Sequence, residues 1–345
     1  MDSTCLMNKL LSTECAEELK NLLRSSRKIV LTCHRSPDGD ALGSILGFAD
    51  YLRELGKMPV VVIPDQFPDF FKWMPTIEKI VRFDKVPSVV SEQIANADLI
   101  VSLDYGQYSR VEALAGLIEK SAATRLVIDH HESPTIETPW LFSFPELSST
   151  CEVVCRLIYE MDDFDKLNRR IATCLYCGMM TDTGGFTYAS TRPEIFDIIG
   201  MLLSKGIDKD KIYRNVYYNY SVFKMKFWGY VLYEKLHYIE NKGAAYFALS
   251  KEELSRFHYV KGDAEGLINE PLKIKGCRLS ISLREDTKTE NKVWVSLRSV
   301  DDLNCITIAE KYFNGGGHLN ASGGTLYCSL AEAEEIVRKV ISNLK

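Results

Sequence analysis

The chain of 345 residues is long enough for two domains, and its 46% hydrophobic and 26% charged residues are typical of a globular protein. A net charge of −5 argues against binding long nucleic acid through a basic surface, and the lack of any run of about 18 apolar residues argues against a transmembrane helix. Residues 1–28 do not have the pattern of a signal peptide, and the ten cysteines have no regular spacing, so we expect reduced thiols and a cytoplasmic protein.

The first half of the chain alternates helix-like and strand-like segments. Residues 15–23 predict an amphipathic surface helix, and residues 40–56, 150–161 and 169–180 have the apolar spacing of further helices. Short apolar runs predict strands at Lys28–His34, Met58–Asp65, Ala97–Gly106 and Thr124–His131. Because continuous apolar strands are buried on both sides, we expect an α/β domain over residues 1–192, with a parallel sheet covered on both faces.

The character of the sequence changes after residue 192. Residues 193–238 are rich in aromatic and charged residues with helical spacing, and we interpret them as a helical connector. Residues 243–250, 277–286 and 292–300 alternate apolar and polar residues, as half-buried strands do. A short helix, a glycine-rich loop, a strand and a last helix are predicted at 307–313, 314–324, 325–330 and 331–345. Residues 239–345 therefore predict a second, smaller α/β domain.

Polar residues that can bind a metal follow the predicted strands of the first domain. They are His34, Asp38 and Asp40 after the first strand, Asp104 after the third, Asp129, His130 and His131 after the fourth, and Asp182 after a helix. Ligands of parallel α/β sheets bind at the carboxyl ends of the strands, where these residues fall. Each alone has a plainer interpretation, since Asp40, for example, can cap the helix that begins at Ala41. Their coincidence predicts a site.

Carboxylates and imidazoles without a thiolate suit Mn²⁺, Mg²⁺ or Fe²⁺ better than a structural zinc ion. Four carboxylates and at least two imidazoles exceed the needs of one catalytic ion, but suit two ions about 3.5–4 Å apart that share a carboxylate. Such a pair indicates hydrolysis of a phosphate ester or anhydride. Cys174 and Cys177 form a CxxC without a second pair, and we interpret them as small apolar residues of a helix.

Four motifs of the sequence resemble those of the DHH phosphoesterases, namely HRSPDGD (34–40), LDYG (103–106), IDHHES (128–133) and MTDTGGF (180–186). SLRS (296–299) with GGGHLNASGG (315–324) resembles the DHH-associated domain of that family. The resemblance covers nearly the whole chain in the expected order. It is greatest for the nano-RNase/pAp-phosphatase (NrnA-like) branch, which lacks long added domains.

The resemblance implies a role for each residue at a matching position. One ion would be held by His34, Asp38 and Asp104, and the other by Asp40, Asp104, His130 and Asp182. Asp104 would bridge the two ions. Asp129 would orient its neighbours, and His131 would act at the scissile phosphate as a hydrogen-bond or proton donor to the leaving oxygen.

The resemblance also implies a nucleotide-binding role for the second domain. Arg298 and His318 would contact the phosphate or base, and Ser296, Ser299 and Asn320 are weaker candidates. Gly315, Gly316 and Gly317 would let backbone N–H groups approach an anion, although a flexible turn would use the same glycines.

The implied activity is hydrolysis of short oligonucleotides (nano-RNA) to nucleoside monophosphates, with removal of the 3′-phosphate of pAp, the adenosine 3′,5′-bisphosphate. The implied cofactors are two divalent cations, Mn²⁺ before Mg²⁺ or Fe²⁺. The expected partners are short RNA or DNA oligonucleotides and small nucleotides, without a membrane or long duplex, and the question of a homodimer stays open.

The alternatives are a cyclic- or linear-dinucleotide phosphodiesterase, a pyrophosphatase or exopolyphosphatase-like hydrolase, and a catalytically silent nucleotide-binding regulator. A structural metal protein is a further alternative.

Overall fold

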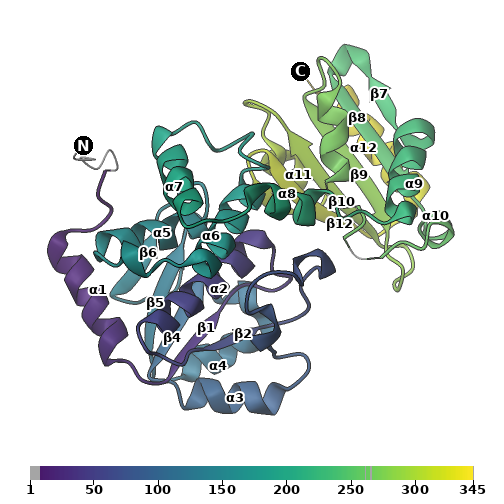
Figure 1. Cartoon of the computed structure of the whole chain (residues 1–345). Coiled ribbons are helices and arrows are strands. Elements are labelled where there is room, and N and C mark those ends of the chain that lie inside the picture. The colour runs from purple at the N-terminus through teal and green to yellow at the C-terminus, as the bar shows by residue number, and fades with distance from the viewer. Residues whose placement is uncertain (1–7, 261, 265, 345) are drawn as a thin grey trace. The chain divides into compact units, whose positions relative to one another are not determined.

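The computed structural model describes residues 8–260, 262–264 and 266–344, so the first seven residues of the N-terminal stretch analysed above lie outside it. The chain divides into two compact units, Met1–Asn219 and Tyr220–Lys345 (Figure 1). The division falls within the predicted connector. Helices α7 (Pro193–Ser204) and α8 (Lys209–Tyr217) belong to the first unit, and α9 (Val222–Tyr230) belongs to the second.

The first unit contains a six-stranded sheet in which every pair of neighbouring strands is parallel. The strand order is β3 (Val81–Arg82), β2 (Val60–Ile63), β1 (Ile29–Thr32), β4 (Leu99–Leu103), β5 (Thr124–Asp129) and β6 (Trp140–Ser143). The four predicted strands are confirmed as β1, β2, β4 and β5. The short edge strands β3 and β6 were not predicted, because neither has a long apolar run.

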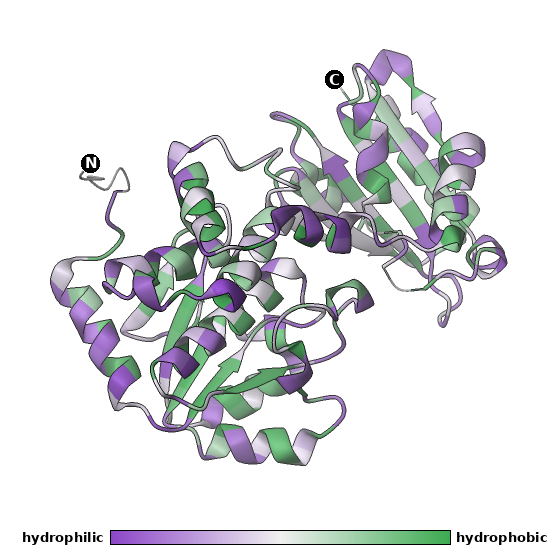
Figure 2. Cartoon of the chain, viewed as in Figure 1, coloured by the Kyte–Doolittle hydropathy of each residue, from purple (hydrophilic) through white to green (hydrophobic). Residues whose placement is uncertain are grey.

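Helices cover both faces of this sheet, as the apolar strands predicted. They are α1 (Thr13–Ser25), α2 (Gly39–Glu54), α3 (Pro87–Ala95), α4 (Ala115–Lys120), α5 (Thr150–Glu160) and α6 (Arg169–Asp182), with 3₁₀ turns at Asp69–Phe71, Ile77–Lys79, Tyr108–Leu114 and Phe164–Lys166. Leu31 packs into a core with α2, α5 and α6, whereas its neighbour Val30 packs on the other face with α3 and α4. The strands are accordingly mostly apolar, and they are largely green in Figure 2.

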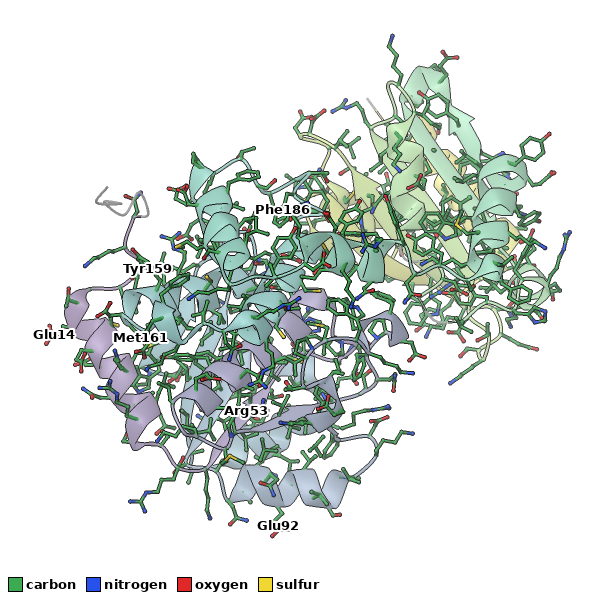
Figure 3. All side chains as sticks on the ribbon, viewed as in Figure 1. Glu14, Arg53, Glu92, Tyr159, Met161 and Phe186 are labelled. Atoms are coloured by element: carbon green, nitrogen blue, oxygen red, sulfur yellow. The ribbon has the colours of Figure 1, made fainter. Side chains whose placement is uncertain are left out.

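Helix α1 is amphipathic, as residues 15–23 predicted. Leu19 and Leu23 are fully buried, and Glu14 points outward from the helix (Figure 3). None of the described helices is long and apolar enough to cross a membrane.

The second unit contains a mixed six-stranded sheet. Its order is β11 (Gly316–His318), β12 (Ala321–Leu326), β10 (Val293–Ser299), β9 (Leu279–Glu285), β8 (Ala244–Leu249) and β7 (His237–Ile239), and only β8 and β9 pair in parallel among these described strands. Helices α11 (Cys305–Tyr312) and α12 (Leu330–Ser342) pack on one face. The remaining helical segments are α10 (Lys251–Arg256), a π-helix at Val231–Lys235, and 3₁₀ turns at Glu240–Lys242 and Leu267–Lys273.

Three expectations for the second unit were wrong. The strand expected at residues 325–330 begins earlier, at Ala321, and ends at Leu326. Strand β8 is buried at every residue rather than half-buried, because a second core around Phe247 and Leu249 covers the face that α12 does not. The glycine-rich segment is a β-hairpin, β11 and β12, rather than a loop. Glycine permits this close strand pairing, since a Cβ on Gly315 would lie 1.8 Å from the Gly323 carbonyl oxygen.

Candidate metal centre

The predicted metal ligands of the first unit come together in two groups. In one group lie His34, Asp38 and Asp104, and in the other lie Asp40, His130 and Asp182, with one possible ligand atom per residue within 4.8 Å of the others. A third group, formed by Asp104, His130 and His131, overlaps these two. The Oδ2 atom of Asp104 lies 3.3 Å from His34 Nε2, and its Oδ1 atom lies 3.8 Å from His130 Nε2. Asp104 therefore faces both groups.

The sheet brings these residues together because β1, β4 and β5 are adjacent and parallel. His34, Asp104 and His130 each follow the end of one of these strands. Asp104 has a φ of 64°, in the left-handed region that aspartate tolerates better than most residues. Its N–H donates to the Ile128 carbonyl oxygen at 3.0 Å, which fixes this sharp turn.

The start of α2 contributes two carboxylates with different surroundings. Asp38 is the N-cap, and its Oδ1 accepts hydrogen bonds from the N–H groups of Asp40 and Ala41, each at 3.0 Å. The second carboxylate oxygen of Asp38 lies 3.8 Å from His34 Nε2. The alternative in which Asp40 caps this helix is therefore wrong, because Asp38 caps it and Asp40 is 1% exposed within the cluster.

Close packing of α2 against α6 and α5 places Asp40 beside the other ligands. A Cβ on Gly178 of α6 would lie 2.9 Å from Asp40 Oδ1 and 2.2 Å from Cys151 Sγ. Asp182 is the last residue of α6, and its Oδ2 lies 3.5 Å from His130 Nε2. Glycine at position 178 thus leaves room for the Asp40 carboxylate between the helices.

The N-terminus of α5 holds two of the carboxylates by hydrogen bonds. The N–H groups of Thr150 and Cys151 donate to the two oxygens of Asp40 at 2.6 and 2.9 Å, and the Thr150 hydroxyl donates to Asp104 Oδ1 at 2.9 Å. These partners were not predicted. The sequence signal was the run of polar residues SSTCE before an apolar helix, which we had interpreted as helix alone.

Asp129 contacts its two histidine neighbours. Its Oδ1 accepts from the N–H groups of His130 and His131 at 2.9 and 3.2 Å, and lies 2.8 Å from His131 Nδ1. The Nδ1 atom of His130 lies 3.4 Å from the Leu147 carbonyl oxygen, and that of His34 lies 2.7 Å from the Arg35 carbonyl oxygen. An Nδ1–H that donates to oxygen leaves Nε2 as the nitrogen that can bind a metal.

The electrostatics of the cluster fit divalent cations. Burial and the nearby Asp104 raise the pKa of Asp40 to about 7, and burial together with Asp40 raises that of Asp182. Burial alone would lower the pKa of His130, but Asp104 and Asp40 raise it to about 9. Cations would relieve this crowding of carboxylates. The Nε2 atom of His34 is buried and has no hydrogen bond of standard geometry among the described residues. Its lone pair is therefore available to coordinate such an ion.

The second unit aligns several predicted substrate-binding residues on one sheet face. His318 of β11 and Arg298 of β10 both pair with Ala321 of β12, so the three residues form one row across the strands. Gly316 and Ser296 pair with Gly323 in the adjacent row. Directly paired residues lie on the same face, and the neighbouring residues of β10 point to the covered face.

The remaining predicted residues of this region have internal partners. The Ser299 hydroxyl is buried on the covered face, where it donates to the Leu303 carbonyl oxygen at 2.6 Å and accepts from Asn320 Nδ2 at 2.9 Å. A Cβ on Gly317 would lie 2.6 Å from the Ala321 carbonyl oxygen, whereas one on Gly316 would meet nothing within 4 Å. Gly316 is thus the glycine of this hairpin at which a side chain would enter open space.

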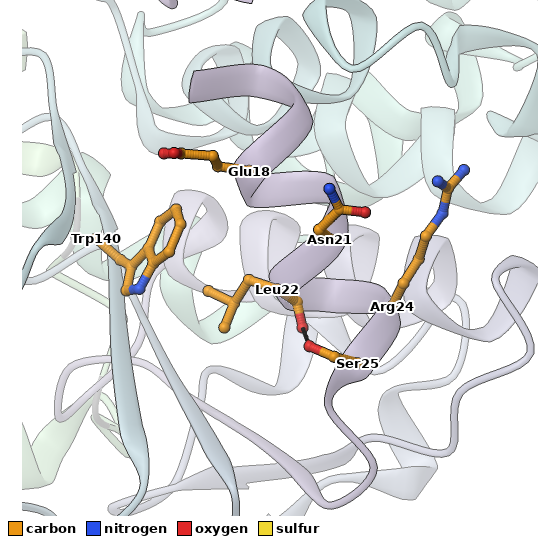
Figure 4. A pocket seen from close by; sticks show the side chains of 6 residues that line it. All are labelled: Glu18, Asn21, Leu22, Arg24, Ser25 and Trp140. Carbon is orange, nitrogen blue, oxygen red and sulfur yellow. Dashed lines mark hydrogen bonds between the residues drawn. The ribbon is translucent and has the colours of Figure 1, made fainter. Parts of the chain in front are cut away.

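Two other features lie apart from these residues. Cys174 and Cys177 are fully buried in α6 and pack in the apolar core of the first unit. A shallow pocket lies between Trp140 and the side chains of Glu18, Asn21, Leu22, Arg24 and Ser25 on α1, and shares no residue with the carboxylate cluster (Figure 4).

Two family patterns match the chain. Residues 28–179 match the DHH family, N-terminal domain, and residues 241–345 match the DHHA1 domain. The first match contains every predicted metal ligand except Asp182, and the second contains Arg298 and His318.

Several known proteins are similar over most of the chain. The bifunctional oligoribonuclease and PAP phosphatase NrnA of Bacillus subtilis is 27% identical over 90% of this chain and 92% of that protein. The cyclic-di-AMP phosphodiesterase PdeA of Listeria monocytogenes is 28% identical over 93% of this chain, which spans 48% of that longer protein. The crystal structure of an exopolyphosphatase-related protein from Bacteroides fragilis is 41% identical, with a TM-score of 0.94 over 97% of this chain and 98% of that one.

Proposed function

The chain belongs to the DHH family, and from this premise we propose that it is a divalent-metal-dependent phosphoesterase. Its substrates in this proposal are short oligonucleotides, which it hydrolyses to nucleoside monophosphates, and pAp, from which it removes the 3′-phosphate. The observation that carries the proposal is the position of Asp104, which belongs to the group of His34 and Asp38 and also faces His130 of the other group. The similarity to a bifunctional oligoribonuclease and PAP phosphatase over nine-tenths of the chain supports the choice of substrates.

In this proposal the site has two cation positions. His34, Asp38 and Asp104 would hold one ion, and a second would be held by Asp40, Asp104, His130 and Asp182. Bound cations supply positive charge to the phosphoryl oxygens and lower the pKa of water held between them. Oxygen and imidazole donors favour Mn²⁺, with Mg²⁺ or Fe²⁺ as further candidates.

His131 would act on the substrate rather than as a metal ligand. Its Nδ1 is the nitrogen nearest Asp104, at 3.6 Å, but the same atom lies 2.8 Å from Asp129 Oδ1. Asp129 is fully buried, and its carboxylate holds the ring through Nδ1, which leaves Nε2 as the nitrogen that can exchange a proton with the substrate. In this proposal His131 Nε2 donates that proton to the leaving oxygen.

The face of β10, β11 and β12 would bind the nucleotide. Arg298 offers a guanidinium for the phosphate, and His318 lies in the same row of the sheet. The backbone of Gly316 and the hydroxyl of Ser296 lie in the next row, beside them. Asn320 and Ser299, which bind each other, would support this face rather than contact the substrate.

Two other functions have a specific observation in their favour. A cyclic- or linear-dinucleotide phosphodiesterase is supported by the similarity to PdeA over 93% of the chain. A polyphosphate-cleaving hydrolase is supported by the similarity to the exopolyphosphatase-related protein of Bacteroides fragilis. All three functions use the same cations and differ in what the second unit must bind.

A substrate panel tests these functions against one another. The Mn²⁺-loaded protein is incubated separately with a 5′-phosphorylated RNA dinucleotide, pAp, cyclic di-AMP and polyphosphate, and the products are separated by chromatography. We expect mononucleotide from the dinucleotide and AMP from pAp. Turnover confined to cyclic di-AMP or to polyphosphate would replace the proposed substrates. Binding of nucleotide without turnover of any substrate would indicate a regulator instead.

A further inference from the structure

The start of α5 contains a run of polar side chains that is almost entirely buried. Ser148 is 4% exposed, and Ser149, Thr150 and Glu152 are fully buried. Polar side chains are buried where hydrogen bonds within the protein replace their hydrogen bonds to water. Ser149 is the N-cap of α5 and accepts from the Glu152 N–H at 3.0 Å, so its role is local. The partners of Thr150 lie elsewhere in the chain.

Thr150 contacts two proposed metal ligands from different elements. Its N–H donates to Asp40 Oδ2 at 2.6 Å, and its hydroxyl donates to Asp104 Oδ1 at 2.9 Å. Asp40 lies in the first turn of α2 and Asp104 follows β4, so one residue connects ligands that are 64 positions apart in the sequence. A carboxylate oxygen that accepts one hydrogen bond keeps a lone pair for a cation. Both carboxylates are thus oriented and still have lone pairs that can coordinate a cation.

The segment that carries Thr150 is itself fixed by an ion pair between the buried Glu152 and the partly exposed Arg192. The Glu152 carboxylate accepts from Arg192 Nη2 at 2.7 Å, and from the Ser148 N–H and hydroxyl at 2.8 and 2.7 Å. Arg192 is the N-cap residue of α7. The residues on both sides of Thr150 are therefore anchored, which limits how far its hydroxyl can move when the carboxylates bind a cation.

We propose that Thr150 is a positioning residue of the metal centre, whose hydroxyl sets the orientation of the Asp104 carboxylate that the two cations share. This inference rests on the proposed function, because it concerns the same carboxylates. Thr150 does not touch the substrate or a cation. It fixes the direction of the Asp104 lone pairs, while its backbone N–H does the same for Asp40. Outer partners of this kind typically contribute about 10- to 100-fold to metal affinity or activity.

The test compares Thr150→Val with Thr150→Ser. Valine keeps the branched shape and the backbone N–H but lacks the hydroxyl, whereas serine keeps the hydroxyl. Ser44→Ala is the matched control, since it also removes a fully buried hydroxyl near the site, but that hydroxyl bonds the Ala41 carbonyl oxygen of its own helix at 3.2 Å. Mn²⁺ binding to each full-length variant is measured by calorimetry and by the electron paramagnetic resonance signal of free Mn²⁺, and thermal unfolding is followed in parallel.

We expect Thr150→Val to weaken Mn²⁺ binding about 10- to 100-fold and to lower kcat more than it raises KM. Thr150→Ser should restore binding close to that of the unmodified chain, and Ser44→Ala should leave it unchanged. Unchanged Mn²⁺ binding by Thr150→Val, or equal losses in Thr150→Val and Ser44→Ala, would overturn the inference while the metal centre stands. Failure of the unmodified chain to bind Mn²⁺ would instead overturn the proposed function.

Discussion

The carboxylate cluster of the first unit and the proposed nucleotide face of the second differ in how their side chains are held. Asp40, Asp104 and Asp129 are at most 2% exposed, and each accepts hydrogen bonds that fix its carboxylate. Arg298 is half-buried and His318 is exposed, on a sheet face where a Cβ at Gly316 would meet open space. These three carboxylates are tightly packed, although Asp38 and Asp182 at the edge of the cluster are partly exposed, whereas the sheet face is open.

This difference matches what each region has to bind. A metal centre needs its donors within about 0.5 Å of a fixed geometry, which packing and second hydrogen bonds provide. A nucleotide face must accept different bases, and open polar side chains allow this. Substitutions in the first unit should therefore affect every substrate, and substitutions on the face should affect substrate affinity alone. Three variants test this division, from the largest expected effect to the smallest.

Asp104→Asn should have the largest effect. Asparagine tolerates the left-handed backbone at this position as aspartate does, so the turn is kept while the shared negative charge is lost. We expect hydrolysis of an RNA dinucleotide and of pAp to fall together, by more than the roughly 10- to 100-fold that an outer hydrogen-bond partner contributes. Bound Mn²⁺, measured by mass spectrometry after desalting, should fall in parallel.

Thermal unfolding of the metal-free proteins is the control for Asp104→Asn, because a similar melting temperature would show that the fold is kept. Near-normal turnover with two bound ions would contradict the role of Asp104 as the shared ligand. Loss of activity on one substrate alone would contradict the division between the two regions.

The parallel sheet and the metal-ligand set could be predicted from the sequence, because both leave strong local patterns. Continuous apolar runs such as Ala97–Gly106 predict strands buried on both faces, and parallel strands bring the residues after them to one edge. His34, Asp104 and His130 could therefore be expected to meet before any distance was known. Asp182 was a candidate ligand from the sequence, but it ends helix α6, so the strand argument does not bring it to this edge, and the family resemblance alone gave it a ligand role.

The hydrogen-bond partners of the ligands could not be predicted in the same way. Both Asp38 and Asp40 stand where an N-cap residue of α2 could stand. Which of them caps the helix depends on which carboxylate accepts from the first N–H groups of the helix. Thr150 reaches Asp104 only because α5 packs against the sheet. No periodic pattern in the sequence predicts that packing. The hairpin of residues 316–326 was mistaken for a loop because glycine is common in loops, where it permits unusual backbone angles. Here glycine also permits two strands to approach closely.

Gly178→Ala tests the tight packing directly. The new methyl group would lie 2.9 Å from Asp40 Oδ1 and 2.2 Å from Cys151 Sγ, so α6 or the Asp40 carboxylate must move. We expect the free energy of unfolding to fall by about 1–3 kcal/mol, as for other overpacked cores, with weaker Mn²⁺ binding. Urea unfolding and calorimetry measure the two effects.

Two glycines serve as references for Gly178→Ala. Gly200 lies in α7 with nothing within 4 Å of a new Cβ, and Gly200→Ala should raise the free energy of unfolding by about 0.5–1 kcal/mol through helix propensity. Gly316→Ala, on the open face, should leave Mn²⁺ binding unchanged. Equal destabilisation by Gly178→Ala and Gly316→Ala would remove the contrast in packing between the two regions.

Arg298→Ala should have the smallest effect on the protein itself and a selective effect on substrate. Loss of a charged hydrogen bond to phosphate costs about 1.5–3 kcal/mol, which corresponds to a rise in KM of about tenfold to a hundredfold for the RNA dinucleotide and pAp. Arg338→Ala is the matched control, since that arginine pairs with Glu334 on α12, which covers the opposite sheet face. Mn²⁺ content should not change in either variant. A loss of Mn²⁺ from Arg298→Ala would mean that the open face supports the metal centre as well, and that the two regions do not act separately.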